Sequence, residues 1–259
     1  MPFKETGFLG DEINEFVKGN IENNKLLEIS YDINRFLNMN LENLMIHDIT
    51  NKDLFIVGLT VKSLQSFDSV LILTKHGLEA DAEVLLRVLL EGVIYIGAIV
   101  NDRDYFLEYL KKSDAQVLTI VNNMKREKYS KFFNEDTIDK IKSEDYRELV
   151  EVVSSKDGKY KKLSAIAEKA EMLDLYLYVY GILSNYVHVN AKIIKGYSDF
   201  KEGKFVGFNN VPSTHDQVFI LVTLNNIMIK LLKLLEKRYC LGFGPSIDTF
   251  ANRLSKWLK

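Results

Sequence analysis

Apolar side chains recur at helical spacing along nearly the whole chain, and residues that break helices are scarce. The 259 residues include three prolines and 14 glycines. Both residue types are costly inside a helix, whereas a β-rich fold uses them in its many turns. The sequence therefore predicts an all-α protein, a single multi-helix bundle, with a small hairpin or loop near residues 197–210 as the exception.

Apolar periodicity and capping residues divide the chain into expected helices. They cover residues 11–46, 51–75, 78–100, 105–124, 137–153, 165–170, 173–194, 215–238 and 247–258. The expected N-caps are Thr50, Asp102, Ser164, Thr214 (in a capping box with Gln217) and Ser246. No repeat or linker separates these helices, so we expect residues 1–259 to form one helical domain.

Composition excludes several classes of protein. A single cysteine, Cys240, cannot form an internal disulfide framework or a multi-cysteine zinc site. Residues 1–10 lack the apolar core of a signal peptide. The most apolar stretch, 84–100, contains Arg87 and Glu91, and each would cost about 2.5–3.5 kcal/mol near the centre of a bilayer. We therefore expect a cytoplasmic protein without a membrane span.

The two ends of the chain carry opposite charge. Residues 1–53 contain 5 basic and 10 acidic side chains, whereas residues 228–259 contain 7 basic and 2 acidic ones. Either the two ends pack together or offset each other, or the basic end presents a surface for nucleic acid.

A stripe of charged residues lies on the expected helix 78–100. Glu79, Glu83, Arg87 and Glu91 follow one another at i, i+4 spacing, with apolar residues on nearly every other face. Buried charges must be paired, so we expect a mostly buried Arg87 with a carboxylate partner. The stripe is either a charge ladder that joins Arg87 to Glu83 and Glu91, or the wall of a functional pocket.

A second polar stripe lies on the expected helix 173–194. Tyr176, Tyr180, Ser184 and His188 again follow at i, i+4 spacing. His188 is either held by a neighbouring carboxylate or acts as an acid or base, since histidine changes charge near neutral pH. Ser184 has no sign of an oxyanion hole and is interpreted as a helix-packing residue. We expect the two stripes to face each other around one cavity.

Metal binding is the main rival to this interpretation. His76, Glu79, Glu83 and His188 are ligands of a suitable type. Bundle di-metal sites, however, use two Glu-x-x-His motifs, and the sequence contains none. We therefore expect no metal and no other cofactor.

Two ordered motifs resemble a widespread bacterial family of uncharacterised helical proteins. They are Ala82-x-x-Leu85-x-Arg87-x-x-x-Glu91 and Tyr180-x-x-x-Ser184-x-x-Val187-His188. The resemblance covers roughly residues 54–191 and implies a helical core. That family has no agreed activity to carry over.

The chain is more distantly similar to the HEPN helical domains of toxin and antiviral systems. Those domains typically dimerise and cleave RNA without a metal, using an Arg-x(4–6)-His motif. The resemblance makes His188 the general acid or base, but residues 181–183 contain no arginine. Arg87, from the other helix, would then stabilise the phosphate, and Glu79 or Glu91 would orient the imidazole or the guanidinium.

Three functional interpretations follow from these patterns. The first is RNA cleavage in a toxin or antiphage role. In the second, a binding module holds a small ligand in a cavity lined by Tyr180, Ser184 and Glu83, and in the third the stripes only lock the bundle. We also expect a homodimer, because residues 218–235 are apolar on more than one face; a fully internal helix is the alternative.

Overall fold

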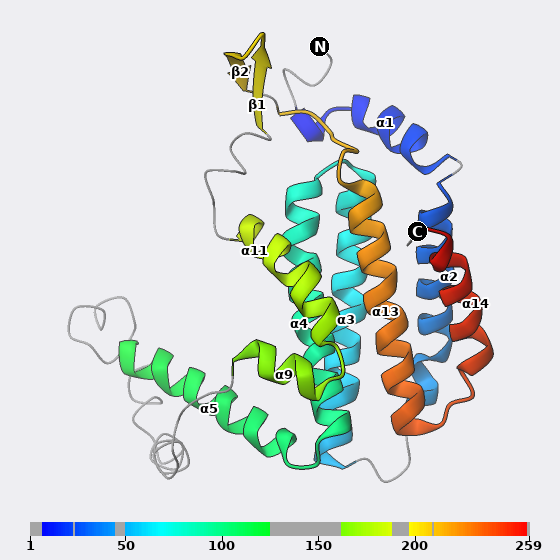
Figure 1. The fold of residues 1–259 in the computed structure, drawn as a ribbon, viewed down its shortest axis with the longest axis vertical. Coiled ribbons are helices and arrows are strands. Elements are labelled where there is room, and N and C mark those ends of the chain that lie inside the picture. The colour runs from blue at the N-terminus through cyan, green and yellow to red at the C-terminus, as the bar shows by residue number, and fades with distance from the viewer. Residues whose placement is uncertain are drawn as a thin grey trace.

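Three long helices form the centre of the molecule in the computed structural model, which describes residues 7–22, 24–44, 50–124, 162–187, 197–208 and 210–257. They are α3 (Asn51–Lys75), α4 (Glu79–Asn101) and α13 (Gln217–Tyr239), and they run side by side (Figure 1). Helix α4 packs extensively against both α3 and α13. The most apolar predicted helix is therefore the central one.

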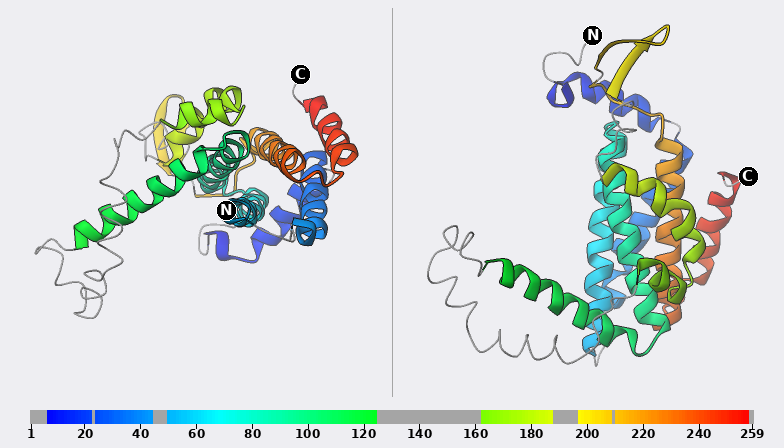
Figure 2. Two further views of the ribbon diagram at one scale, coloured as in Figure 1. Left: turned by 90° about the horizontal axis from the view of Figure 1, so that it is seen from below. Right: turned by 60° about the vertical axis from the view of Figure 1, so that its left-hand side comes forward.

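Shorter helices surround this centre. Helices α2 and α14 pack against α13, whereas α9 and α11 cover α4. Helix α1 crosses one end of the bundle, and α5 leaves it at the other end (Figures 1 and 2). The bounds of the surrounding elements are η2 (Gly7–Leu9), α1 (Glu12–Ile21), α2 (Lys25–Asn40), η3 (Leu41–Leu44), α5 (Tyr105–Met124), α9 (Leu163–Lys169), α10 (Leu173–Leu175), η4 (Tyr176–Tyr180), α11 (Gly181–Val187), α14 (Gly244–Leu254) and η6 (Ser255–Trp257).

A β-hairpin interrupts the helices where the sequence predicts a small hairpin or loop. Strands β1 (Ser198–Lys201) and β2 (Lys204–Phe208) pair antiparallel. The two residues between them, Glu202 and Gly203, have φ angles of 52° and 76°. Positive φ at both positions is typical of a tight hairpin turn. The described residues contain no other strand, which confirms the all-α fold class.

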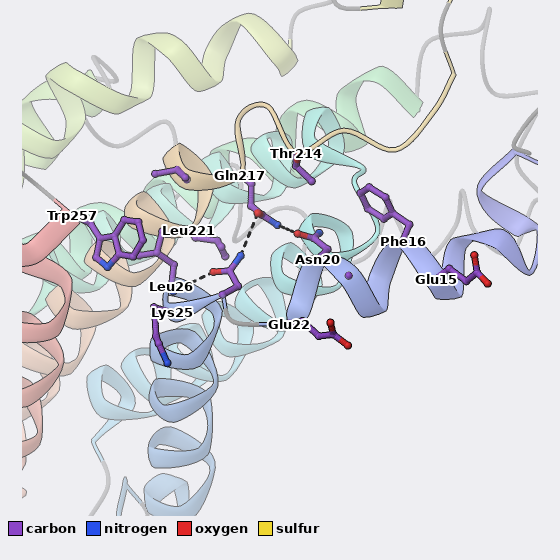
Figure 3. Close-up of a pocket in the computed structure, with 13 residues that line it drawn as sticks. Glu15, Phe16, Asn20, Glu22, Lys25, Leu26, Thr214, Gln217, Leu221 and Trp257 are labelled. Carbon is purple, nitrogen blue, oxygen red and sulfur yellow. Dashed lines mark hydrogen bonds between the residues drawn. The ribbon is translucent and has the colours of Figure 1, made fainter. Parts of the chain in front are cut away.

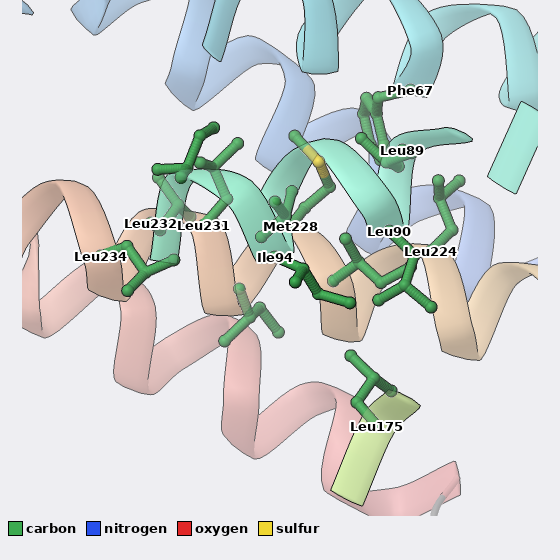
Figure 4. Close-up of a cluster of buried hydrophobic side chains, with 14 of the residues drawn as sticks. Phe67, Leu89, Leu90, Ile94, Leu175, Leu224, Met228, Leu231, Leu232 and Leu234 are labelled. Carbon is green, nitrogen blue, oxygen red and sulfur yellow. The ribbon is translucent and has the colours of Figure 1, made fainter. Parts of the chain in front are cut away.

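The core fills the space where α3, α4 and α13 meet. Phe67, Leu90, Ile94, Leu224 and Met228 are among its fully buried side chains (Figure 4). Burial therefore continues around several faces of α13, within one chain. The fully internal alternative accounts for the composition of residues 218–235, so this helix gives no separate reason to expect a dimer.

Several predicted helix ends are confirmed. The Thr50 hydroxyl accepts a hydrogen bond from the Asp53 amide and begins α3. Helices α3 and α4 are separated near the predicted break, where Gly77 turns the chain with a φ of 72°. Helix α5 spans the predicted residues, but Asp102 is not its N-cap, because its carboxylate accepts a hydrogen bond from the amide of Asp104, which precedes the helix.

Other predicted helices are wrong in their bounds. The expected helix 11–46 is two helices, because the Asn24 side chain accepts hydrogen bonds from the Leu26 and Leu27 amides and starts a new helix. Helices α9, α13 and α14 begin at other residues than the predicted caps imply, with no side-chain cap at any of the three. The expected helix 137–153 lies outside the described residues.

The oppositely charged ends of the chain pack together. Arg238 of α13 pairs with Asp53 of α3 at 2.7 Å, and Arg253 of α14 pairs with Asp32 of α2 at 2.6 Å. These contacts favour mutual packing of the ends over a basic surface for nucleic acid.

Two described helices, α3 and α13, are long and apolar enough to cross a membrane by length and composition alone. Within the bundle, 44% and 67% of their most apolar windows are buried, respectively. Core helices of this kind pass the same test, so the finding is weak evidence for a span.

Candidate functional site

Arg87 joins the centre of α4 to η4. Its Nε donates to Glu91 Oε1 at 3.0 Å, and its Nη2 donates to the Tyr180 hydroxyl at 2.7 Å. The hydroxyl in turn donates to the same Glu91 oxygen at 3.0 Å, and the guanidinium lies 4.6 Å from the centre of the Tyr180 ring. With 15% of its side chain exposed, Arg87 is mostly buried and has the expected carboxylate partner.

The network keeps Arg87 charged. Burial works against the guanidinium charge, but the hydrogen bonds to Glu91 and Tyr180 outweigh it and raise the pKa of Arg87 above its usual value. The same three groups bond to one another in a closed triangle, although Arg87 Nη1 has no partner in the described structure. Such an arrangement fixes the position of η4 against α4.

A π-helical turn places Tyr180 in this network. The expected regular helix from residue 173 contains η4, a π-helix over Tyr176–Tyr180. The rings of Tyr176 and Tyr180 stack with centroids 4.7 Å apart. π-Helical turns are rare and occur frequently at functional sites. The next stripe residue, Ser184, donates to the Tyr180 carbonyl at 2.7 Å, as a helix-packing serine does.

Glu83 lies one turn before Arg87 on α4 and is only 1% exposed. It forms a hydrogen bond with the Tyr186 phenol of α11. Burial, with the Asp216 and Glu79 carboxylates nearby, raises the pKa of Glu83 to about 8, although the bond to Tyr186 works the other way. Glu83 is therefore mostly protonated at neutral pH.

The charge-ladder alternative for α4 holds for one of its two pairs. Arg87 bonds to Glu91 but forms no ion pair with Glu83 in the described structure. Within that part of the chain, Glu83 Oε2 and Arg87 Nη1 are buried without a hydrogen-bond partner. The neighbouring helical segment explains this, because Arg87 bonds to Tyr180 and Glu83 bonds to Tyr186.

Glu79 ties the start of α4 to the start of α13. It is 7% exposed, and its Oε1 accepts a hydrogen bond from the Asp216 amide at 3.0 Å. Two residues earlier, the Gly77 carbonyl accepts from the Ser213 amide at 3.0 Å. A Cβ on Gly77 would lie 2.7 Å from both Pro212 Cβ and the Ser213 nitrogen. The segment 77–81 is therefore clamped against residues 212–216.

These two segments enclose a pocket of about 490 Å³ at the end of the bundle where α4 and α13 begin. That volume is typical of small-molecule sites, which span roughly 300–1,000 Å³. The polar side chains around it come from α4, α11, the approach to β1 and the loop before α13. The described lining residues are Phe8, Gly77, Leu78, Glu79, Ala80, Asp81, Tyr186, Tyr197, Asn210, Val211, Pro212, Ser213, His215 and Asp216.

A second pocket, of about 620 Å³, lies at the same end between α1, α2 and α13 (Figure 3). A chain of amide side chains crosses it: Gln217 donates to Asn20, and Asn24 donates to Gln217. Asn20 also donates to the carbonyls of Thr74 and Lys75 at the end of α3. Gln217 therefore links four helices here instead of forming the predicted capping box with Thr214.

The predicted site residues separate into two places. Arg87, Glu91 and Tyr180 form the closed network, and they are not among the residues that line either pocket. Glu79 lines the smaller pocket, and Glu83 bonds to Tyr186, which also lines it. Ser184 bonds within its own helix, and His188 lies outside the described residues, so the expectation of one shared cavity around His188 stays untested.

The pocket also contains residues that the sequence analysis missed. Tyr186 follows Ser184 by two positions and therefore points away from the predicted stripe on an ideal helix. Tyr197 lies in the expected hairpin or loop, and Asp216 lies in the first turn of the expected helix 215–238, so neither belongs to a polar stripe that would mark it. Among the described residues, no three His, Cys, Asp or Glu side chains gather closely enough to hold a metal ion.

Comparison with known proteins identifies the family. The family model of DUF5677, described as a family of unknown function, matches residues 53–205. The chain belongs to the DUF5677 family. The match contains both motifs on which the resemblance to an uncharacterised helical family rests, and it extends past the expected core of 54–191. No curated protein and no solved structure matches the chain.

The DUF5677 match contains one wall of the smaller pocket. Glu79, Asp81, Tyr186 and Tyr197 lie within residues 53–205, whereas Asp216 lies beyond them. The family description names no activity, so the function has to be argued from the geometry.

Proposed function

We propose that this DUF5677 protein is a binding module that holds a small ligand in the pocket at the start of α4 and α13. One observation carries the proposal: a pocket of about 490 Å³ around which carboxylates and phenols from four segments converge. Concave sites with a few converging polar groups are the usual places where proteins bind small molecules.

The walls of the pocket support this interpretation because they are fixed in the folded chain. Glu79 bonds to the Asp216 amide, and Gly77 packs against Pro212. A ligand then meets preformed groups and does not have to order them, which favours affinity. The Arg87 network contributes indirectly, because it fixes η4 against α4 and thereby positions Tyr186 on the following helix α11.

A pocket-filling substitution tests the proposal. Ala80 lines the pocket, so Ala80→Trp fills it, whereas Ala80→Ser leaves its volume open and serves as the matched control. A fragment library screened by ligand-observed NMR should yield binders of the wild type and of Ala80→Ser that are lost in Ala80→Trp. Circular dichroism melts verify that both variants fold. A screen without binders, or with binders that Ala80→Trp retains, would refute the proposal.

A second candidate function is metal-independent RNA cleavage of the HEPN type, acting in the cytoplasm in a toxin or antiphage role. One observation favours it: Arg87 is bonded to Tyr180 on the helical segment that ends at Val187, directly before His188 in the sequence. His188 would act as general acid or base, and Arg87, oriented by Glu91, would stabilise the phosphate charge.

Expression in bacteria distinguishes the two candidates. A ribonuclease should arrest growth and fragment cellular RNA, and His188→Ala should abolish both effects. His215→Ala, at a histidine whose side chain is 89% exposed, is the control and should remain toxic. Unimpaired growth with intact RNA for the wild type would contradict cleavage and leave the binding module.

A further inference from the structure

The charged groups that line the pocket are almost all acidic. Glu79, Asp81 and Asp216 contribute carboxylates. Among the described lining residues there is no lysine or arginine, and His215 is the one basic side chain. His215 points mostly into solvent and lies 4.0 Å from an Asp216 oxygen. The pocket therefore presents a negative electrostatic potential to a ligand.

The raised pKa values of two tyrosines at the pocket reflect this negative potential. Burial raises the pKa of Tyr197, and the Asp81 and Glu83 carboxylates raise it further. Burial also raises the pKa of Tyr186, with Glu83, Asp216 and Glu79 adding to the effect. Each phenol stays neutral because its neighbours oppose a further negative charge. Neutral aromatic rings beside carboxylates are a favourable environment for an organic cation.

The buried side chain of Glu83 also leaves a hydrogen-bonding atom unpaired beside the pocket residues. Its side chain is buried, and its Oε2 has no hydrogen-bond partner in the described structure. The groups that interact with it, namely Tyr186, Asp216 and Glu79, all line the pocket. The Glu83 carboxyl group is therefore a buried neighbour of the residues that line the pocket.

An anionic ligand is the natural alternative, because α4 and α13 both begin at this pocket and helix N-termini attract anions. In this protein the chain supplies its own anions there. Glu79 accepts from the Asp216 amide, and Asp81 lies in the first turn of α4. The N-terminal partial charges are thus already offset by carboxylates.

We propose that the pocket selects a small organic cation, a primary amine in its ammonium form, with Asp81 and Asp216 as charge partners and the rings of Tyr186 and Tyr197 against its carbon chain. The inference rests on the proposed binding function and names the ligand class for that same pocket. Glu79 stays engaged with α13 and contributes its charge from the wall.

Three probes of nearly the same shape and different charge test the inference. They are 2-phenylethylamine, 2-phenylethanol and 3-phenylpropionate, titrated into the wild type at pH 7 by ligand-observed NMR. We expect the amine to bind about tenfold more tightly than the alcohol, since an added ion pair in a partly enclosed site is worth about a factor of ten. The carboxylate should not bind.

Variants locate the binding. Asp81→Asn should raise the Kd of the amine about fivefold, the upper effect of an exposed ion pair. Asp174→Asn is the matched control, because Asp174 is also exposed, lies in the first turn of a helix and is not among the pocket residues. It should leave the Kd unchanged.

The outcomes separate this inference from the proposed function. Tighter binding of the alcohol or the carboxylate, lost in Ala80→Trp, would overturn the cation preference and leave a ligand-binding pocket. Equal sensitivity of the amine to Asp81→Asn and Asp174→Asn would show general attraction to an acidic surface and overturn the site. Failure of all three probes, together with an empty fragment screen, would overturn both.

Discussion

Arg87 shows how a buried charge is paired with residues from two helical segments. Its partner on the same helix, Glu91, follows from i, i+4 spacing, but Tyr180 is 93 residues away in the sequence. Glu83 has the same spacing from Arg87 and instead bonds to Tyr186. The facing segment, η4 and α11, therefore supplies one partner to Arg87 and one to Glu83.

Removal of Arg87 should destabilise the protein. We expect Arg87→Ala to lower the free energy of unfolding by about 1–3 kcal/mol, because two charge-assisted hydrogen bonds are lost while Glu91 can still reach water. Arg35→Ala is the control, since Arg35 is exposed and its carboxylate partner lies 3.9 Å away. Urea denaturation measures both. A change as small as that of Arg35→Ala would show that the network contributes nothing.

Glu83 should make stability depend on pH. Its pKa rises from an ordinary value of 4.5 to about 8 on folding, so the native state binds the extra proton between these values. Stability should therefore be greatest below pH 4.5 as far as this group is concerned, and should fall as pH rises to 8, by at most about 1.4 kcal/mol per pH unit.

Glu83→Gln removes this titration. In urea denaturation from about pH 5 to about pH 8.5, the wild type should lose stability relative to Glu83→Gln as pH rises. Glu12→Gln, at an exposed glutamate of α1, should follow the wild type. Parallel curves for the wild type and Glu83→Gln would mean that the folded carboxyl titrates at an ordinary pKa.

At the scale of elements, the connection between α3 and α4 decides where the pocket forms. Gly77 turns the chain with a positive φ and lies against Pro212 and Ser213. The contact brings residues 77–81 against the loop before α13, and these two segments are the pocket walls. The π-helical turn η4 acts in a similar way, because it sets which residues of α11 face α4.

Gly77→Ala separates backbone strain from close contact. Gly203 in the hairpin has a φ of 76° but no atom within 4 Å of the place that a Cβ would take, so Gly203→Ala introduces strain alone, about 1 kcal/mol. Gly77→Ala adds contacts of 2.7 Å with Pro212 and Ser213, and we expect a clearly larger loss of unfolding free energy. Equal losses, measured by thermal denaturation, would show that residues 212–213 move aside without cost.

At the scale of the whole molecule, α13 is buried within one chain. The expected homodimer would therefore have to form through other surfaces. Leu177, Tyr178 and Ile182 of η4 and α11 are exposed, as is Val88 of α4. Exposed apolar side chains on neighbouring helices are typical of interaction surfaces.

We therefore predict a dimer in light scattering at micromolar concentration, which Leu177→Glu should dissociate. Leu9→Glu, at a leucine that is also exposed but lies in η2 near the N-terminus, should remain dimeric. A wild-type mass of 29.9 kDa would refute the dimer.

The sequence by itself determined the helical class, the place of the hairpin or loop, and the burial of Arg87 beside a carboxylate. Apolar periodicity and turn residues act over a few positions, so a single chain segment contains that information. Only the tertiary structure decided that Glu83 bonds to Tyr186 instead of Arg87, and that Tyr197 and Asp216 join Glu79 around a pocket. Those groups are remote in sequence, and packing of the helices brings them together.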